Sequence, residues 1–235
     1  MSVLTSSYAA LQILELSARV LVDHRLGRFT RERGDRVAEQ MARRVVRKTQ
    51  MHVSVRGKAI PTGRAFVVMS NHQSHMDIPL LWYVMQGHTL RFCAKSEFRN
   101  VPIWGPALEK GECVMIDRKD RVRAIESLKR AERLVESGVN VWIAPEGTRS
   151  RDGRLAPFKK GGFHLAAGTG ADILPIAING TINVLPPDTL SIRKHIPIDV
   201  VVGSPIATAN RDMGRVMEEV REFLEEHVDQ DVYAG

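Results

Sequence analysis

Apolar and polar positions follow two different periods along this chain. Over roughly the first fifty residues, apolar side chains recur every three or four positions, which predicts amphipathic helices at 2–26 and 30–51. Gly27 lies between the two segments and is suited to end the first helix. We therefore expect an N-terminal amphipathic α-hairpin over residues 1–51 ahead of a main domain over 52–235.

Beyond the hairpin, the pattern changes to short apolar runs separated by turns and helices. Strands that alternate with helices predict the α/β class, with a mixed, largely parallel sheet flanked by helices. The strands are expected at 52–55, 65–70, 90–94, 112–116, 139–144, 172–178 and 198–202. The helices of this domain are expected at 77–86, 122–136, 162–168 and 211–228.

Length and composition narrow the class of protein. At 235 residues and 43% hydrophobic side chains, the chain can bury a core and is not a disordered tail. Its two cysteines do not make a disulfide scaffold, which fits a reducing compartment. No apolar stretch reaches the roughly 18–20 residues of a spanning helix, and no basic stretch precedes the first helix as in a signal peptide.

The positive charge is concentrated near the N-terminus. The chain has a formal net charge of +7, and residues 1–56 hold 11 basic against 5 acidic side chains, whereas 207–235 hold 3 against 8. A basic patch attracts polyanions such as nucleic acid, anionic lipid or phosphorylated metabolites. Charge alone does not choose among these partners.

The second helix of the hairpin carries much of this charge, and two interpretations of it are open. In one, the hairpin packs on the main domain with solvated arginines pointing outward. In the other, it is an interfacial membrane anchor whose arginines meet lipid phosphates. The basic side chains concerned are Arg31, Arg33, Arg36, Arg43, Arg44, Arg47 and Lys48.

Candidate chemistry is densest in residues 71–77, Asn-His-Gln-Ser-His-Met-Asp, which follow an apolar strand and open a helix. In a parallel sheet this is the carboxyl edge, where ligands bind. Asp77 can contact one ring nitrogen of His72 and leave the other free to take a proton. Alternatively, Asp77 caps the helix and backbone groups satisfy His72. A metal cluster of His72, His75 and Asp77 is a weaker alternative, and His75 fits a helix start or pocket wall better.

A second cluster follows the buried strand at 139–144. The strand runs into Pro145 and then Glu146-Gly147-Thr148-Arg149, which unites a carboxylate, a flexible glycine and a guanidinium. Glycine lets backbone N–H groups approach an oxyanion, and arginine presents a planar fork to phosphate. This pattern favours an anion site over a basic surface loop.

Two more cations are expected at the same edge of the sheet. Lys95 follows the strand at 90–94, and Arg118 follows the strand at 112–116. Together with His72 and Arg149 they suggest a base beside a phosphate pocket. Cys113 falls inside a predicted strand and is interpreted as a core residue.

Four blocks in order resemble the glycerolipid acyltransferases, in particular the 1-acylglycerol-3-phosphate O-acyltransferases. They span about 66–178, nearly half of the chain, and comprise residues 71–77, the segment 95–118 that ends in Ile-Asp-Arg, residues 146–150 (Glu-Gly-Thr-Arg-Ser) and residues 174–178 (Leu-Pro-Ile-Ala-Ile). The resemblance implies acyl transfer from a thioester, either acyl-CoA or acyl carrier protein, to the sn-2 hydroxyl of lysophosphatidic acid.

The resemblance also implies roles for the remaining candidates. Arg118 and Arg149 are expected to hold the acceptor phosphate, while Glu146 orients the acceptor or an arginine. Lys95 or a backbone N–H near Gly147 is expected to stabilise the oxyanion, and Thr148 belongs to the same substrate-binding segment. No metal and no cofactor beyond the thioester co-substrate is expected.

The expected partners are anionic membrane lipids and not nucleic acid, with the protein peripheral or monotopic at the cytoplasmic face of a membrane. Three alternatives stay open. One is acyl transfer to another lysolipid, and the second is hydrolysis of an ester or thioester through His72 and Asp77. The third is a non-enzymatic protein that binds anionic lipid or nucleic acid.

Overall fold

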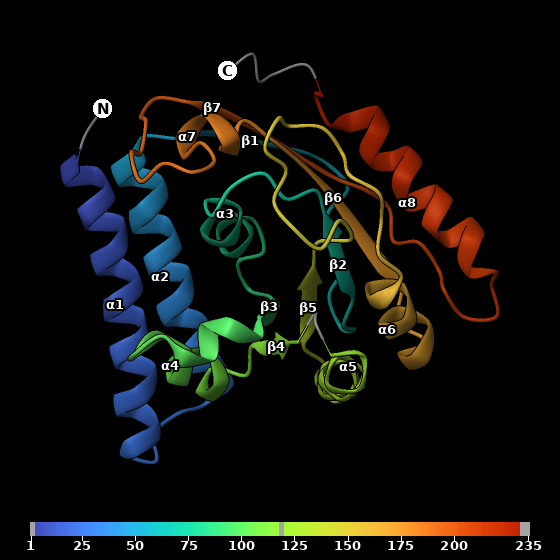
Figure 1. Ribbon diagram of the computed structural model, residues 1–235, viewed down its shortest axis with the longest axis horizontal. Coiled ribbons are helices and arrows are strands. Elements are labelled where there is room, and N and C mark those ends of the chain that lie inside the picture. Colours follow the sequence, from blue (N-terminus) through green and yellow to red (C-terminus); the bar gives the residue numbers. More distant parts are fainter. Residues whose placement is uncertain (1–2, 118–119, 231–235) are drawn as a thin grey trace.

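The structure is a computed structural model that describes residues 3–117 and 120–230 (Figure 1). Its strands are β1 (His52–Gly57), β2 (Val67–Ser70), β3 (Leu90–Lys95), β4 (Val114–Ile116), β5 (Asn140–Ile143), β6 (Ile173–Asn179) and β7 (Pro197–Val202). The longer helices are α1 (Val3–Arg25), α2 (Arg31–Thr49), α5 (Arg121–Glu136) and α8 (Met213–His227). Shorter helices are α3 (Asp77–Val84), the 3₁₀ helix η1 (Ser96–Asn100), α4 (Trp104–Lys110), α6 (Gly161–Thr169) and α7 (Thr181–Val184).

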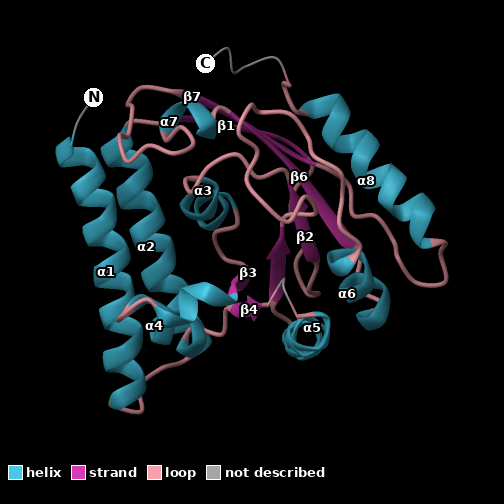
Figure 2. Cartoon of the chain, viewed as in Figure 1, coloured by secondary structure: helices cyan, strands magenta, loops and turns pink. Residues whose placement is uncertain are grey.

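The strands of the described residues form a seven-stranded sheet in the order β1-β7-β6-β2-β5-β3-β4 (Figure 2). Neighbouring strands are parallel except β6 and β7, which are antiparallel. The predicted mixed, largely parallel sheet is therefore confirmed. The carboxyl ends of β2 to β6 lie at one edge of this sheet, and β1 and β7 begin at that same edge.

The central strand β2 shows how the sheet acquires a core on both faces. Successive side chains of a strand point to opposite faces. Val68 is buried in a cluster with residues of α2 and α3, whereas Val67 is buried in a cluster with residues of α5, α6 and α8. Helices consequently cover the sheet on both sides, and α1 lies outside α2 (Figure 1).

The N-terminal hairpin forms as predicted and packs on the main domain. Gly27 has a φ of +63° between the two helices, and the Thr30 hydroxyl caps α2 by accepting the N–H of Arg33 at 3.2 Å. The buried face of α2 includes Met41 and Val45, which share a hydrophobic core with the sheet. Burial of this apolar face is what holds the hairpin against the domain.

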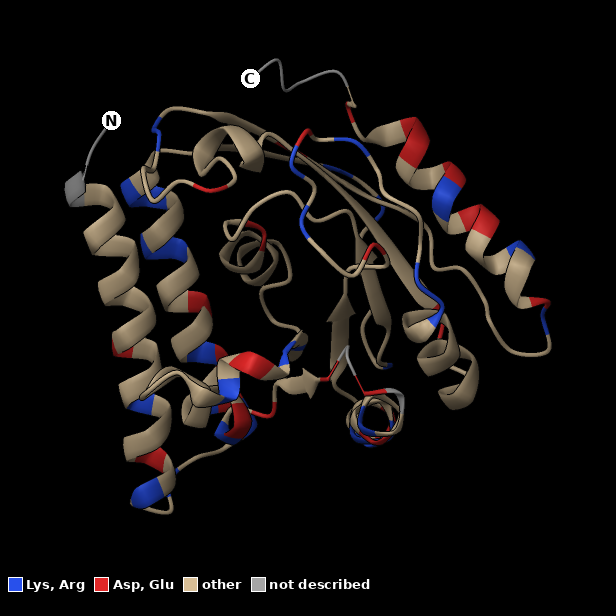
Figure 3. Cartoon of the chain, in the orientation of Figure 1, with Lys and Arg blue, Asp and Glu red and all other residues tan. Residues whose placement is uncertain are grey.

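Figure 3 shows Lys and Arg residues along α2, and part of their charge is paired within the protein. Three of its arginines form ion pairs within the protein. The pairs are Arg31 with Glu112 at 2.9 Å, Arg33 with Asp23 at 2.5 Å and Arg44 with Glu15 at 3.0 Å. These internal pairs reduce the charge that the hairpin can offer to a polyanion, whereas Arg36, Arg43, Arg47 and Lys48 are exposed as the first interpretation expects.

Three short helices were not predicted: η1, α4 and α7. Of these, α4 begins at Trp104. Its helical signal is weak because no side chain caps its start, and Gly105 and Pro106 occupy the first turn. A Cβ at Gly105 would lie 2.2 Å from the carbonyl oxygen of Arg99, so this close approach requires glycine.

Candidate active site

His72 and Asp77 meet at the carboxyl end of β2. The His72 Nδ1 atom lies 2.7 Å from Asp77 Oδ2, so the imidazole donates to the carboxylate through this nitrogen. The His72 side chain is 16% exposed, whereas Asp77 is fully buried. Asp77 therefore fixes the ring, and the opposite nitrogen, Nε2, stays available to a substrate. The predicted contact between these two residues is confirmed.

Asp77 is itself held by donors from two parts of the chain. Its Oδ2 atom accepts the backbone N–H groups of Gln73 at 2.8 Å and Ser74 at 3.0 Å. Its Oδ1 atom accepts the Thr181 hydroxyl at 2.5 Å. Asp77 thus closes the turn that precedes α3 while it also contacts His72. The alternative, in which Asp77 caps the helix, is wrong, because the N-cap is Met76 and no side chain caps this helix. Thr181 is a residue of this site that sequence reasoning missed.

Polar side chains fix the end of β2 against its neighbours β6 and β5. The Asn71 side-chain amide donates to the carbonyl of Ile178 and accepts the N–H of the same residue, both at 2.8 Å. The Trp142 ring meets the His72 ring edge to face with a centroid distance of 5.3 Å, and its indole N–H donates to Ser70 at 2.9 Å. These contacts fix the end of β2 and the His72 ring beside it, which favours a constant orientation of the imidazole.

Glu146 is buried beside the His72 turn and accepts hydrogen bonds from two segments. It is only 2% exposed, and its two oxygens accept the backbone N–H groups of His72 at 3.0 Å and Ala156 at 2.9 Å. Burial raises the pKa of Glu146 above its usual value of 4.5, although these two hydrogen bonds act in the opposite direction. Each oxygen thus accepts one backbone N–H, and Glu146 joins the His72 turn to the segment at Ala156. The role expected for Glu146, which is to orient the acceptor or an arginine, stays a prediction.

The segment after Glu146 runs beside the His72 turn. Gly147 has a φ of +72°, and its N–H donates to the carbonyl of Ala144 at 3.0 Å. This N–H is therefore already used inside the loop and is not free to stabilise an oxyanion. The N–H of Ser150 donates to the carbonyl of His72 at 2.7 Å, which joins the two loops. Thr148 is exposed and Arg149 is half-buried between these points.

His75 lies on the same turn at the rim of the site. Its side chain is exposed, but loss of hydration beside the loops lowers its pKa to about 4, and the positive charge of Arg149 acts in the same direction. His72 and Lys95 contribute weaker repulsion, while Asp77 opposes the shift. Arg149 and Lys95 thus lie within electrostatic reach of this turn, and His75 is neutral near pH 7.

The remaining cations are placed to different degrees. Lys95 ends β3 and is exposed. Arg118 lies outside the described residues, so its predicted place beside the phosphate site is not described.

Cys113 precedes β4, and desolvation raises the pKa of its thiol to about 11, which keeps it protonated. Among the described residues no group of three His, Cys, Asp or Glu side chains is arranged to hold a metal ion.

Comparison with known proteins assigns the chain to a family. The model of a family described as Acyltransferase matches residues 52–179, more than half of the chain. The protein named 1-acyl-sn-glycerol-3-phosphate acyltransferase BAT2, chloroplastic, from Brassica napus is 38% identical over 147 residues, which is 63% of this chain and 42% of that protein. LPAT1, chloroplastic, from Arabidopsis thaliana, named as the same enzyme, is 36% identical over 163 residues, 69% of this chain and 45% of that protein.

The likeness extends to a solved structure. The crystal structure of the 1-acyl-sn-glycerophosphate (LPA) acyltransferase PlsC from Thermotoga maritima superposes with a TM-score of 0.75 and 28% sequence identity. The alignment covers 95% of this chain and 94% of that one. By contrast, the chain spans about half the length of the curated relatives it matches. The family model, these relatives and the shared fold together show that the chain belongs to the acyltransferase family.

Proposed function

We propose that this chain transfers an acyl group from a thioester to the sn-2 hydroxyl of lysophosphatidic acid and yields phosphatidic acid. The observation that carries the proposal is the contact of His72 Nδ1 with a buried Asp77, which directs Nε2 toward the substrate. The names of the relatives and of the solved neighbour support the choice of acceptor.

In the proposed reaction, His72 Nε2 takes the proton of the acceptor hydroxyl as its oxygen attacks the thioester carbonyl. Asp77 stabilises the imidazolium that forms. The tetrahedral intermediate then collapses, the carbon–sulfur bond breaks, and the imidazolium returns its proton to the departing thiolate. The hydroxyl attacks directly, so the step uses neither a serine nor a cysteine acyl-enzyme.

The proposed oxyanion donor is Lys95 or a backbone N–H of the loop beyond Gly147, because the Gly147 N–H is already bonded to Ala144. Arg149, with Arg118, is proposed to hold the acceptor phosphate. Among the described residues Arg149 forms no ion pair, so its guanidinium keeps its donors for a ligand. Thr148 is exposed on the same segment and can add a hydroxyl donor.

The thioester is proposed to be acyl-CoA or the pantetheine thioester of acyl carrier protein. Either one enters as a co-substrate, and His72 supplies the acid–base chemistry. The proposed reaction therefore needs neither a resident metal nor a bound cofactor.

Membrane contact is proposed through α1, which buries Ala9 and Val20 in the protein and has further apolar residues on its outward face. Its polar residues Gln12, Ser17 and Asp23 are buried against the protein, while large apolar residues point outward. The exposed apolar residues are Leu11 at 56%, Ile13 at 42%, Leu14 at 47% and Val22 at 53%. Such a face is stabilised when it lies in a lipid interface.

The proposed location at a membrane surface rests on the outward apolar face of α1. Across the described helices, none has the length and apolar character needed to cross a bilayer. We propose that the protein lies on the cytoplasmic face of a membrane, where its lysolipid acceptor resides. Nucleic acid is not a proposed partner, and the ion pairs of Arg31, Arg33 and Arg44 weaken the case for it.

An acyl-transfer assay with purified protein tests the proposal. Each donor is supplied in turn with lysophosphatidic acid and with other lysolipids as acceptors. His72→Ala is expected to lower kcat by about 10²–10⁴-fold, because general base catalysis contributes a factor of that size. His164→Ala, a change at an exposed position of α6, is the matched control and keeps full activity. Near-normal turnover by His72→Ala would refute the assignment.

A further inference from the structure

Thr181 contacts Asp77 from outside the catalytic turn and at the second carboxylate oxygen. His72 and two backbone N–H groups of the turn contact the Oδ2 atom of Asp77 at 2.7–3.0 Å. The Thr181 hydroxyl instead contacts the Oδ1 atom at 2.5 Å. The two oxygens of this carboxylate are therefore held from different parts of the chain.

The Thr181 hydroxyl is the donor in this contact. An ionised carboxylate only accepts hydrogen bonds, so the proton between the two oxygens belongs to the hydroxyl. A hydrogen bond to a charged acceptor is shorter and stronger than one between neutral groups, which agrees with the 2.5 Å separation. Because both residues are completely buried, the low dielectric constant around them strengthens the bond further.

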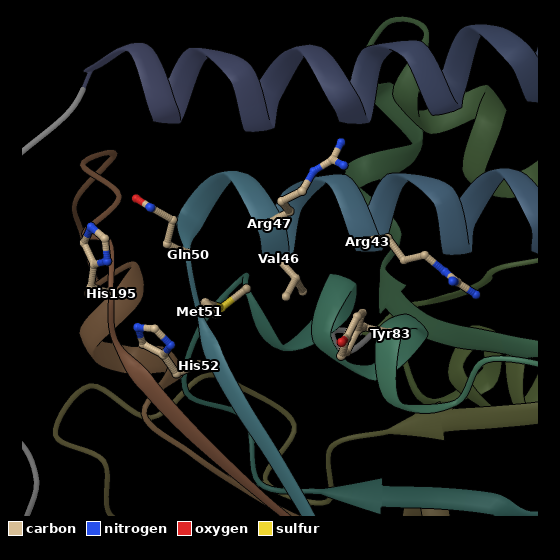
Figure 4. A pocket seen from close by; sticks show the side chains of 8 residues that line it. All are labelled: Arg43, Val46, Arg47, Gln50, Met51, His52, Tyr83 and His195. Carbon is tan, nitrogen blue, oxygen red and sulfur yellow. The ribbon is translucent and has the colours of Figure 1, made fainter.

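Solvent does not reach the contact between Thr181 and Asp77. Both residues are 0% exposed. The groove in Figure 4 lies between α2, α3, β1 and the segment before β7, and its lining includes neither of the two residues. A side chain of the same shape as threonine would leave no room for water at this position. The second oxygen of Asp77 therefore depends on a donor that the chain itself supplies.

The backbone after β6 turns sharply and brings Thr181 to this position. Gly180 has a φ of +95°, and a Cβ there would lie 2.3 Å from the carbonyl oxygen of Pro197, so the turn requires glycine. α7 then begins at Thr181. Because β6 pairs with β2, a residue just beyond the end of β6 lies beside the end of β2, where the catalytic turn starts.

The end of β6 is also held by the C-terminal helix α8. The Asn179 side-chain amide donates to the carbonyl of His227 at 2.8 Å, and its oxygen accepts the N–H of Asp229 at 2.9 Å. Gly180, the next residue, lies against the start of β7. Two elements outside the catalytic turn thus fix the backbone that carries the Thr181 hydroxyl, which suits this residue to act as an anchor.

We propose that Thr181 is a positioning residue that fixes the plane of the Asp77 carboxylate and thereby keeps Oδ2 in line with His72 Nδ1. This role rests on the proposed function, in which His72 is the general base. The terminal torsion of an aspartate side chain is soft, so a carboxylate held at one oxygen can turn about its Cβ–Cγ bond. A donor on the other oxygen removes this freedom. Turning would tilt the imidazole and move Nε2 away from the acceptor hydroxyl.

Three substitutions in the full chain separate the hydroxyl of Thr181 from its volume. Thr181→Val keeps the shape and removes the donor, Thr181→Ser keeps the donor, and Thr181→Cys offers only the weaker donor of a thiol. We expect the kcat of Thr181→Val to fall about 10²-fold, because a small misplacement of a reacting group costs about that much. The KM for lysophosphatidic acid should stay unchanged, since Thr181 is buried away from the substrate. Thr181→Ser should stay near the wild type, with Thr181→Cys between the two.

Thr208→Val is the matched control for the loss of a buried threonine hydroxyl. Thr208 is 5% exposed, and its hydroxyl donates to the carbonyls of Ala166 at 3.2 Å and Ala171 at 2.9 Å. This variant should lose stability and keep its kcat. Equal losses of kcat in the two valine variants would overturn the positioning role. Equal kcat values of Thr181→Ser and Thr181→Cys would do the same, and this comparison decides the question if Thr181→Val does not fold.

The NMR signal of the His72 Nδ1 proton, measured without substrate, gives a readout that does not depend on turnover. A proton held between this nitrogen and a carboxylate has a downfield chemical shift, and its absence in His72→Ala assigns the signal. We expect it in the wild type, Thr181→Ser and Thr208→Val, and we expect it to move upfield or broaden in Thr181→Val. An unchanged signal in Thr181→Val would overturn the positioning role. A wild type that shows these signals but transfers no acyl group to lysophosphatidic acid would contradict only the proposed function.

Discussion

Asp77 is the residue on which the contacts of the catalytic turn converge. It accepts hydrogen bonds from His72, from two backbone N–H groups and from Thr181 while it is completely buried. A buried carboxylate with this many donors is fixed in place, so it can orient the imidazole without a large reorganisation during the reaction. Its structural contribution and its proposed catalytic contribution can be separated by substitution.

Asp77→Asn should separate them. The asparagine oxygen can still accept from His72 and the turn, and the Thr181 hydroxyl can rotate to accept from the new amide. We therefore expect a loss of only about 1 kcal/mol in the free energy of unfolding, within the range of one hydrogen bond. The kcat should fall by about 10²–10⁴-fold, because the imidazolium loses its negative partner.

Denaturant unfolding and steady-state acyl transfer measure the two effects on the same preparation. Asp188→Asn, on an exposed loop, serves as the control for the chemical change. A variant that loses stability and activity in proportion would show that Asp77 acts only through the fold.

His75 reports on the position of Arg149. With its pKa near 4 in the folded protein and an ordinary value of 6.5, His75 is neutral in the fold where the unfolded chain is protonated. Its contribution to stability is therefore present above pH 6.5 and is lost as the pH falls toward 4. His75→Gln should reduce this acid sensitivity.

The titration of His75 by NMR tests the cause of the shift. Arg149→Gln removes the second largest contribution, so we expect the midpoint of His75 to move up toward 6.5. Arg211→Gln, at a position just before α8 that is paired with Glu219, should leave the midpoint unchanged. An unchanged midpoint in Arg149→Gln would place that guanidinium away from the turn.

At the scale of elements, the two helices of the hairpin differ in what they bury. α2 buries its apolar face in the core, whereas α1 buries Gln12 and Ser17 and exposes leucines. The same periodicity therefore predicted both helices but not the direction in which α1 faces. Polar partners on α2 decide that direction, since Arg44 reaches Glu15 on α1.

Leu14→Gln tests the outward face of α1. Leu14 is 47% exposed, so burial of this exposed part in lipid would contribute roughly 1 kcal/mol, about half of a full leucine. We expect roughly fivefold weaker flotation with phosphatidylcholine vesicles and an unchanged melting temperature. Val55→Gln, at 51% exposure on β1, is the matched control and should bind as the wild type does. Equal losses in the two variants would argue against α1 as the membrane face.

At the scale of the whole molecule, a buried ionic network connects the hairpin to the sheet. Arg91 of β3 is 4% exposed and contacts Asp35 of α2 at 2.5 Å and Glu112 at 3.5 Å, while Glu112 also pairs with Arg31. Asp35 further accepts the Thr89 hydroxyl at 2.7 Å. The hairpin is thus held to the domain by charge as well as by apolar packing.

Asp35→Ala should disturb this attachment strongly. It leaves Arg91 buried with a weaker partner, and loss of one member of a buried pair costs about 3–5 kcal/mol of the free energy of unfolding. Asp199→Ala breaks the exposed pair with Arg56 and should cost less than about 1 kcal/mol. Chemical denaturation compares the two. A small effect of Asp35→Ala would show that apolar packing alone holds the hairpin.

The sequence by itself determined the hairpin, most strands and the contact between His72 and Asp77. These features depend on side chains within a few positions of one another, so spacing along the chain encodes them. The cap at Thr30 and the apolar run of β2 are signals of the same local kind. The short helix α4 was not predicted because its first turn contains glycine and proline and no side chain caps its start.

Only the tertiary structure decided which residues support the contact between His72 and Asp77. Glu146 and Thr181 lie 74 and 104 residues from their partners on the catalytic turn, and no local pattern links such distant positions. They meet because β2 lies between β5 and β6, whose ends bring both side chains to the same edge of the sheet. Strand order, unlike strand identity, depends on how the whole chain packs its two cores.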